Sequence, residues 1–139
     1  MTFLVHTLTG VALGEITNEP IVAFGLGAGI HLIMDKIPHY WPDKLPVQLF
    51  YQAIDVILTL AVIYFVVTSK AGMTPAILFG ILGSLSVDFI LVNPWTFRTK
   101  FGTWHHDRQP HKPGYLYLLP DTLISLALIS FILVYGAMR

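Results

Sequence analysis

Long apolar stretches separated by short polar segments dominate the chain. The five helices that this pattern predicts are residues 2–16, 20–37, 47–68, 74–93 and 115–136. The last three reach the length of about 20 apolar residues that a membrane helix needs. The second is slightly short and stays apolar from Pro20 to His31. The first is a short, glycine-bearing helix that ends before the turn TNEP.

Two longer polar loops, residues 38–46 and 94–114, are rich in Pro, Trp, His and charged residues. If the helices cross back and forth, both loops and the N-terminus lie on one side, and the short turns lie on the other. All histidines and aspartates then fall toward the loop side, whereas Glu15 and Glu19 fall at the opposite end as solvated turn residues. The expected fold is a single all-α transmembrane domain over residues 1–139.

Composition agrees with a membrane protein. Hydrophobic residues make up 55% of the chain and charged residues 12%, and the mean hydropathy is +0.69. A soluble domain usually carries about 25% charged residues. The formal net charge is zero, so no global field attracts nucleic acid. The absence of cysteine excludes disulfides, thiolate metal sites and cysteine nucleophiles.

Basic residues favour one orientation in the membrane. The loop side holds Lys36, Lys44, Arg98, Lys100, Arg108 and Lys112, and the opposite side holds Lys70 and Arg139. By the positive-inside rule the loop side is cytoplasmic, which predicts a multi-pass protein of the cell membrane. A basic rim that serves an anionic substrate would leave the same signature.

The chain also contains an apparent internal repeat. Residues 51–67 and 117–133 share a Tyr-x-x-x-Asp motif and several apolar residues in register, and the helices before them each end in an aspartate. This predicts one short N-terminal helix followed by two helix–loop–helix repeats. Repeats two spans apart run parallel, about an axis along the membrane normal. The alternative is plain glycine-rich helix packing.

Six residues form the predicted metal site. His31 and Asp35 are four residues apart, so they share one face of a helix. Ionised aspartates inside a membrane are costly and repel one another, so a metal ion or shared protons should hold them together. The predicted ligands are His6, His31, Asp35, Asp55, Asp88 and Asp121. Mixed imidazole and carboxylate donors suit one or two divalent ions, Zn or Mn above others.

The loop segment FGTWHHDRQPHKPG offers catalytic groups beside such a site. We expect His106 and His111 to act as acid or base and Arg108 to bind phosphate. With two metal ions this set is typical of phosphoester hydrolysis. The predicted substrate is a membrane lipid or another phosphorylated amphiphile.

Each residue also has a structural explanation. His31 and Asp35 can form a simple hydrogen-bonded pair at a helix end. Asp55 and Asp121 can cap a helix or pair with loop lysines. Tyr51 and Tyr117, one turn before those aspartates, can hydrogen-bond a ligand carboxylate.

Several motifs resemble those of the predicted membrane-bound metal-dependent hydrolases of bacteria and archaea. They are His6 with Gly10, the segment HLIMDKIPH at residues 31–39, SVDFI at 86–90 and HHDRQPH at 105–111. The resemblance implies a metal-dependent hydrolase and names no substrate. The second repeat departs from the pattern, with Ser84 where a histidine equivalent to His31 would fall.

Two other classes of function remain open at this stage. A cation or proton transporter would also place aspartates between duplicated helices, although the far halves of the helices carry few polar residues. A small membrane subunit with a structural metal ion would carry the same ligands without an open coordination position. Haem binding between His6 and His31 is disfavoured by the carboxylates nearby.

Overall fold

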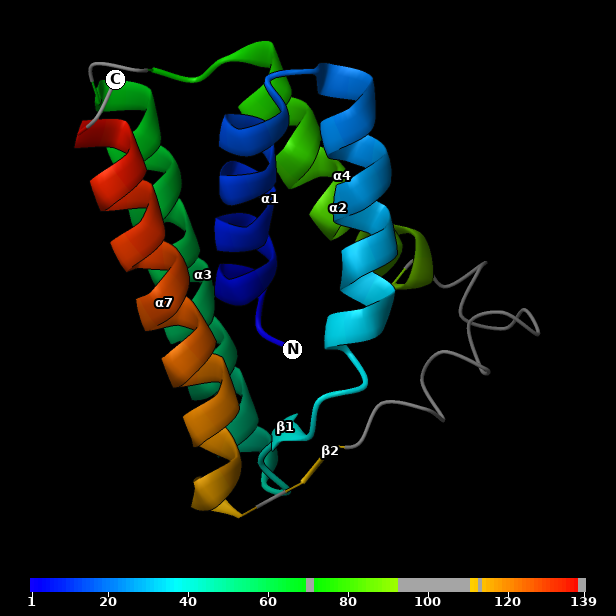
Figure 1. Ribbon diagram of the computed structural model, residues 1–139. Helices are drawn as coiled ribbons and strands as arrows, with labels where there is room; N and C mark the ends of the chain where they lie inside the picture. The colour runs from blue at the N-terminus through cyan, green and yellow to red at the C-terminus, as the bar shows by residue number, and fades with distance from the viewer. Residues whose placement is uncertain (70–71, 93–110, 113, 138–139) are drawn as a thin grey trace.

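The computed structural model describes residues 1–69, 72–92, 111–112 and 114–137 (Figure 1). Its elements are α1 (Phe3–Thr17), α2 (Pro20–Met34), β1 (His39–Tyr40), α3 (Leu45–Thr68), α4 (Pro75–Val92), β2 (His111–Lys112), the 3₁₀ turn η1 (Tyr115–Tyr117) and α7 (Leu118–Ala137). Within the described part of the chain, the predicted all-α architecture with five helices is confirmed.

Local chemistry explains where the first two helices begin and end. The Thr2 hydroxyl accepts a hydrogen bond from the Val5 amide and caps α1, which ends at Asn18 in the left-handed conformation (φ 53°). Pro20 occupies the first position of α2. That helix ends at Met34, three residues earlier than predicted. Pro38 disfavours helical backbone in the residue before it, which shortens the helix.

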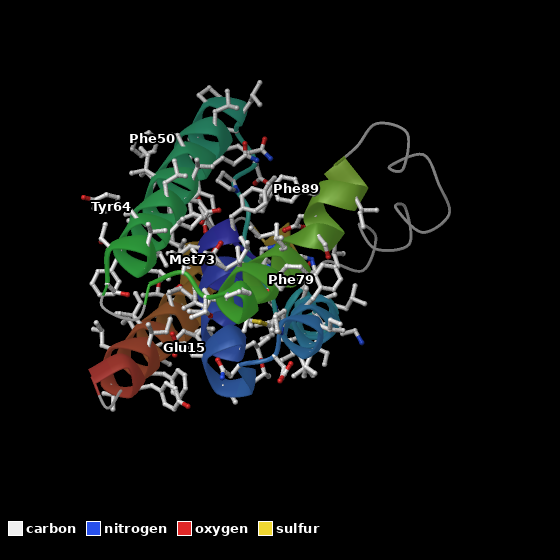
Figure 2. All side chains as sticks on the ribbon, turned by 90° about the horizontal axis from the view of Figure 1, so that it is seen from above. Glu15, Phe50, Tyr64, Met73, Phe79 and Phe89 are labelled. Carbon is white, nitrogen blue, oxygen red and sulfur yellow. The ribbon has the colours of Figure 1, made fainter. Side chains whose placement is uncertain are left out.

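Helix α1 is the centre of the bundle. It contacts α2 and α4 on one side and α3 and α7 on the other (Figure 1). The view along the bundle shows the same arrangement, with α1 surrounded by the other four helices (Figure 2). Helices α2 and α4 run in the same direction, and α3 and α7 run together in the opposite direction. The N-terminus and both short strands lie toward one end of the bundle.

Glycines allow α4 to approach α1 and α2 with almost no side chain between the backbones. A Cβ atom on Gly10 of α1 would lie 2.5 Å from the Cα atom of Ile81. A Cβ atom on Gly27 of α2 would lie 2.8 Å from the Gly80 carbonyl oxygen and from the Ser84 nitrogen. Close packing of this kind is typical of membrane helices, where small residues let backbones meet. It fixes α4 beside the residues that form the site below.

Polar residues share the interior with an apolar core, and large apolar residues are exposed on the outside. In the described part of the chain, twelve polar or charged residues are buried, among them three histidines and three aspartates. Large apolar residues cover the outside; Phe50 and Tyr64, for example, lie on the outer side of α3 and are 68% and 70% exposed (Figure 2). Monomeric soluble proteins rarely expose apolar surface on this scale.

Among the described residues, two helices are long and apolar enough by length and composition to cross a membrane: Leu45–Thr68 and Tyr115–Tyr135. Only 17% and 11% of their most apolar windows are buried inside the protein. Helices α1, α2 and α4 are apolar but shorter.

The two polar loops meet at a short parallel pair of strands. His39 pairs with His111, and Tyr40 pairs with Lys112. The sequence carries no alternating pattern at these four residues that predicts a strand. The pairing ties the loop after α2 to the segment before α7 at the end of the bundle where the N-terminus lies.

We predict that Gly27→Ala destabilises the protein by about 1–3 kcal/mol, because the new methyl group meets backbone atoms of α4. Gly29→Ala, two residues along the same helix, is the matched control, since a Cβ atom there has open space around it. The control should be neutral or slightly stabilising because alanine favours helix. Thermal unfolding in detergent measures both variants. Equal destabilisation by the two substitutions would contradict the packing described here.

Candidate metal centre

His31 lies at the centre of the polar cluster. It is in the last turn of α2 and is fully buried. Its Nδ1 atom is 2.6 Å from the Ser84 carbonyl oxygen of α4. Its Nε2 atom is 3.0 Å from Asp35 Oδ2 and 3.5 Å from Asp88 Oδ1. One ring therefore meets a carbonyl on one edge and two carboxylates on the other.

These contacts determine which tautomer the His31 ring adopts. A carbonyl oxygen only accepts hydrogen bonds, so Nδ1 of His31 must be the protonated nitrogen. In a neutral ring, Nε2 then bears a lone pair that points toward two carboxylates, which is unfavourable. Either a second proton or a metal ion must lie between Nε2 and these oxygens. A backbone carbonyl on Nδ1 is the usual support of a histidine that ligates metal through Nε2.

His6 brings a second imidazole to the same point from α1. Its ring stacks on that of His31 with centroids 4.0 Å apart and an interplanar angle of 21°. Its Nε2 atom is 3.2 Å from Asp35 Oδ1. One ligand atom each from His6, His31 and Asp88 lies within 4.8 Å of the others. Three helices thus contribute to one buried donor set that can hold a metal ion.

The spacing of the donors fits a small divalent ion. Bonds of about 2.1 Å place neighbouring ligand atoms about 3.0 Å apart at a right angle and about 3.4 Å apart at the tetrahedral angle. The nitrogen–oxygen distances from the two histidines to Asp35 and Asp88 are 3.0, 3.2 and 3.5 Å. Direct hydrogen bonds from a protonated His31 would give similar distances. The donors, two imidazoles with carboxylates, are those that Zn, Mn and Fe accept.

Asp35 follows the last residue of α2 and connects both histidines. Burial on its own raises the pKa of its carboxyl group, but the contacts with both imidazoles outweigh burial and hold the pKa well below its ordinary value. The Met1 amino nitrogen adds to this effect at 2.6 Å from Oδ1. The same nitrogen is 3.3 Å from Nε2 of His39, whose pKa is lowered by burial and by the amino group.

Asp55 binds backbone amides of α1 and does not contact the two histidines in any hydrogen bond or ion pair between described residues. Its Oδ2 atom accepts a hydrogen bond of 2.8 Å from the Phe3 amide, and its Oδ1 atom accepts one of 3.0 Å from the Leu4 amide. These are free amides at the first turn of α1, where the helix dipole favours a negative charge. A carboxylate of α3 therefore caps α1 and holds the turn that carries His6. The prediction that Asp55 ligates metal is not supported by these contacts.

Asp121 of α7 is 5% exposed, and neither of its carboxylate oxygens has a well-formed hydrogen bond to a described residue. The Tyr51 hydroxyl of α3 is near enough to interact with it. Tyr51 thus faces the aspartate of α7 as well as Asp55 of its own helix. Asp121 lines a cavity between α3 and α7, together with Asp55.

The structure brings four of the six predicted ligands together: His6, His31, Asp35 and Asp88. Asp55 and Asp121 lie beside the neighbouring cavity, and their role as ligands stays a prediction. Of the predicted catalytic residues, His106 and Arg108 lie outside the described residues. The backbone of His111 pairs with β1, and its side chain lies outside the described part.

The sequence did not indicate the role of Ser84 or the burial of Glu15. The carbonyl group of Ser84, the position that breaks the predicted repeat, orients His31. Every residue has a backbone carbonyl group, so no pattern of side chains predicts that the one of Ser84 contacts His31. Glu15 is 6% exposed rather than solvated, so that prediction is wrong, while Glu19 is exposed as expected.

No protein-family model, curated protein or solved structure matches the chain.

We predict that Asp55→Asn destabilises the protein by about 1–3 kcal/mol, because the charge-assisted hydrogen bonds to the start of α1 are weakened. Asp43→Asn, at an exposed position in the loop before α3, is the control and should change stability by less than about 0.5 kcal/mol. Thermal unfolding in detergent measures both. An Asp55→Asn protein as stable as the Asp43→Asn protein would show that the cap contributes nothing.

Proposed function

We propose that the chain is an integral membrane protein that binds a divalent metal ion and hydrolyses a phosphoester bond in an amphiphilic substrate. The proposed ligands are His6, His31, Asp35 and Asp88. Zn or Mn is the proposed ion. The described residues support one such ion; a second one stays a prediction.

The environment of His31 is the observation that carries the proposal. Its Nδ1 atom contacts the Ser84 carbonyl, and its Nε2 atom faces two carboxylates, the buried one of Asp35 and the partly buried one of Asp88. The alternative to a metal ion is a proton, held by His31 as an imidazolium or by one of the two carboxyl groups. Glycine packing holds α4 rigidly against α1 and α2, which keeps the donors together without an ion. Preorganisation of this kind is what a metal site needs.

Different residues have different roles in the proposed hydrolysis. A bound divalent ion supplies Lewis-acid chemistry for phosphoester hydrolysis. Burial of His6 and His31 excludes bulk water and strengthens electrostatic interactions at the site. We assign proton transfer to the leaving group to His106 or His111, and phosphate binding to Arg108, as the sequence predicts. Asp55 positions α1, and Ser84 positions His31.

The membrane location is supported by the exposed apolar surface of the four outer helices, α2, α3, α4 and α7, and by the two candidate spans. We assign the site to the end of the bundle where the N-terminus and both strands lie, because the donors belong to the helix ends there. The positive-inside rule makes this end cytoplasmic. A substrate whose reactive group lies at a membrane interface fits this depth.

A cation or proton pathway is the second candidate. Buried Glu15, near the end of α1 away from the metal centre, favours it because intramembrane carboxyl groups commonly mark such pathways. A cavity between α1, α3 and α7 argues against it, since every residue that lines it is apolar. Uptake of a metal ion or protons into proteoliposomes would favour transport over hydrolysis.

Metal content tests the site directly. We predict about one Zn or Mn per chain in protein purified in mild detergent, and at least a tenfold loss in His31→Gln and in Asp88→Asn at equal free metal. Glu19→Gln, an exposed carboxylate at the opposite end of the bundle, is the control and should keep its metal. Elemental analysis gives the content, and circular dichroism checks the fold. A well-folded protein without metal, or unchanged content in His31→Gln, would overturn the site.

Hydrolysis is tested separately. Vesicles that contain phosphatidate or a polyprenyl phosphate provide phosphomonoester substrates, and phosphate release is the readout. We predict release that chelator abolishes, that Zn or Mn restores, and that His31→Gln reduces at least a hundredfold. Release that survives both chelator and His31→Gln would remove the hydrolase proposal while leaving the metal site intact.

A further inference from the structure

A groove runs between α3 and α7, with α1 as its floor. Two cavities form it, of about 300 Å³ and about 250 Å³, and both are lined by Leu4 of α1 and Leu58 of α3. Helices α3 and α7 lie side by side along the bundle but contact α1 more than each other (Figure 1). The shared residues make the two cavities one continuous groove.

The two ends of the groove differ in chemistry. The first cavity is lined only by apolar residues of α1, α3 and α7, Ala61 among them. The second, nearer the N-terminus of α1, adds Thr2, Tyr51, Asp55, Asp121, Thr122 and Ser125 to apolar neighbours. A mostly apolar pocket with a few convergent polar groups is the usual form of a small-molecule site.

Asp121 points to a missing partner at the polar end. The side chain is 95% buried by area, and its two oxygens lack well-formed hydrogen bonds to described residues. Buried polar groups are normally satisfied, and an unpaired buried carboxylate is costly. The oxygens of Asp55 already accept two amide hydrogen bonds from α1. Asp121 is therefore the carboxylate at this end of the groove that no backbone amide caps, with the Tyr51 hydroxyl as its near neighbour.

We propose that this groove binds a single-chain amphiphile with a protonated amine head group, the amine at Asp121 and the chain between α3 and α7. An ammonium group donates three hydrogen bonds, which suits the Asp121 carboxylate and the hydroxyl groups beside it. The apolar cavity has room for about ten groups the size of a water molecule, at about 30 Å³ each, which is one alkyl chain of moderate length.

Charge complementarity selects the amine over other head groups. Two carboxylates line the polar end, and the described lining residues include no lysine or arginine, so a phosphate or carboxylate head would be repelled. The Met1 amino group interacts with Asp121 at longer range but is hydrogen-bonded to Asp35. A metal ion would need more donors than Asp121 provides, because Asp55 is committed to the cap. The groove is thus a site apart from the metal centre and does not depend on catalysis.

The test uses the full chain in nanodiscs and a photoactivatable dodecylamine with a diazirine near the end of its chain. Diazirine-labelled lauric acid and dodecanol are the head-group controls. Mass spectrometry maps the labelled peptides. We expect the amine to label segments 57–66 and 126–133, and the acid and the alcohol to label them at least tenfold less.

Variants tie the labelling to the groove. Asp121→Asn should reduce labelling by the amine at least tenfold, and Asp121→Glu, which keeps the charge, should retain most of it. Ala61→Trp fills the apolar end and should also abolish labelling. Ala127→Trp, on an exposed part of α7 that does not line either cavity, should leave labelling unchanged. Metal content should stay at the wild-type level in Asp121→Asn, which separates this site from the metal centre.

Three results would overturn the proposal. One is equal labelling by amine, acid and alcohol. Another is amine labelling spread evenly over the outer faces of all helices. The third is unchanged amine labelling in Asp121→Asn with wild-type thermal stability. If Asp121→Asn fails to fold, the comparison of Ala61→Trp with Ala127→Trp tests the proposal instead. Equal amine labelling of these two variants would show that the amine does not bind in the groove.

Discussion

A buried histidine held between a carbonyl oxygen and two carboxylates is the constraint on which the account depends. The Ser84 carbonyl requires a hydrogen on Nδ1 of His31, and Asp35 and Asp88 require positive charge at Nε2. In a water-poor interior that charge cannot be left to solvent. The site therefore holds either a shared proton, on the ring or on a carboxyl group, or a bound cation. The second imidazole, His6, stacks on His31 and turns its own Nε2 toward Asp35, which supports a shared cation.

The rest of the fold can be understood as the frame for this contact. Small residues on α1, α2 and α4 remove the side chains that would keep the backbones apart. Only that approach brings a carbonyl of α4 to a histidine of α2. The Asp55 carboxylate reaches from α3 to the first amides of α1 and sets the turn that carries His6. Close packing at small residues and polar contacts between helices are both typical of proteins whose outer surface is apolar.

Much of this architecture could be predicted from residue pattern alone. Apolar length predicted five helices, and the four-residue spacing of His31 and Asp35 predicted their common face. The grouping of His6 and Asp88 with His31 and Asp35 followed from helix direction. Helices that cross back and forth bring the start of α1 and the ends of α2 and α4 to the same side. The early end of α2 was missed because a proline also removes the helical hydrogen bond to the carbonyl four residues before it, which for Pro38 is that of Met34. Aspartates with the same spacing from a tyrosine were predicted to play the same role, yet Asp55 caps a helix while Asp121 faces a groove.

Other features had no sequence signal. The orienting carbonyl of Ser84 belongs to the backbone, and the pairing of β1 with β2 involves two residues from each loop. The groove between α3 and α7 arises because both helices pack on α1 more than on each other. Such features depend on where helices touch, which periodicity does not specify. The internal repeat remains a prediction, although α2 and α4 run in the same direction, as do α3 and α7.

The most direct measurement is anomalous diffraction from crystals of the full chain grown with Zn or Mn, with data collected on both sides of the absorption edge of that metal. The account predicts one strong anomalous peak within about 2.0–2.3 Å of Nε2 of both His6 and His31, with a carboxylate oxygen of Asp35 or Asp88 completing the contact. A well-ordered site without an anomalous peak, in which Nε2 of His31 contacts the two carboxylates directly, would show that His31 is an imidazolium and would contradict the account.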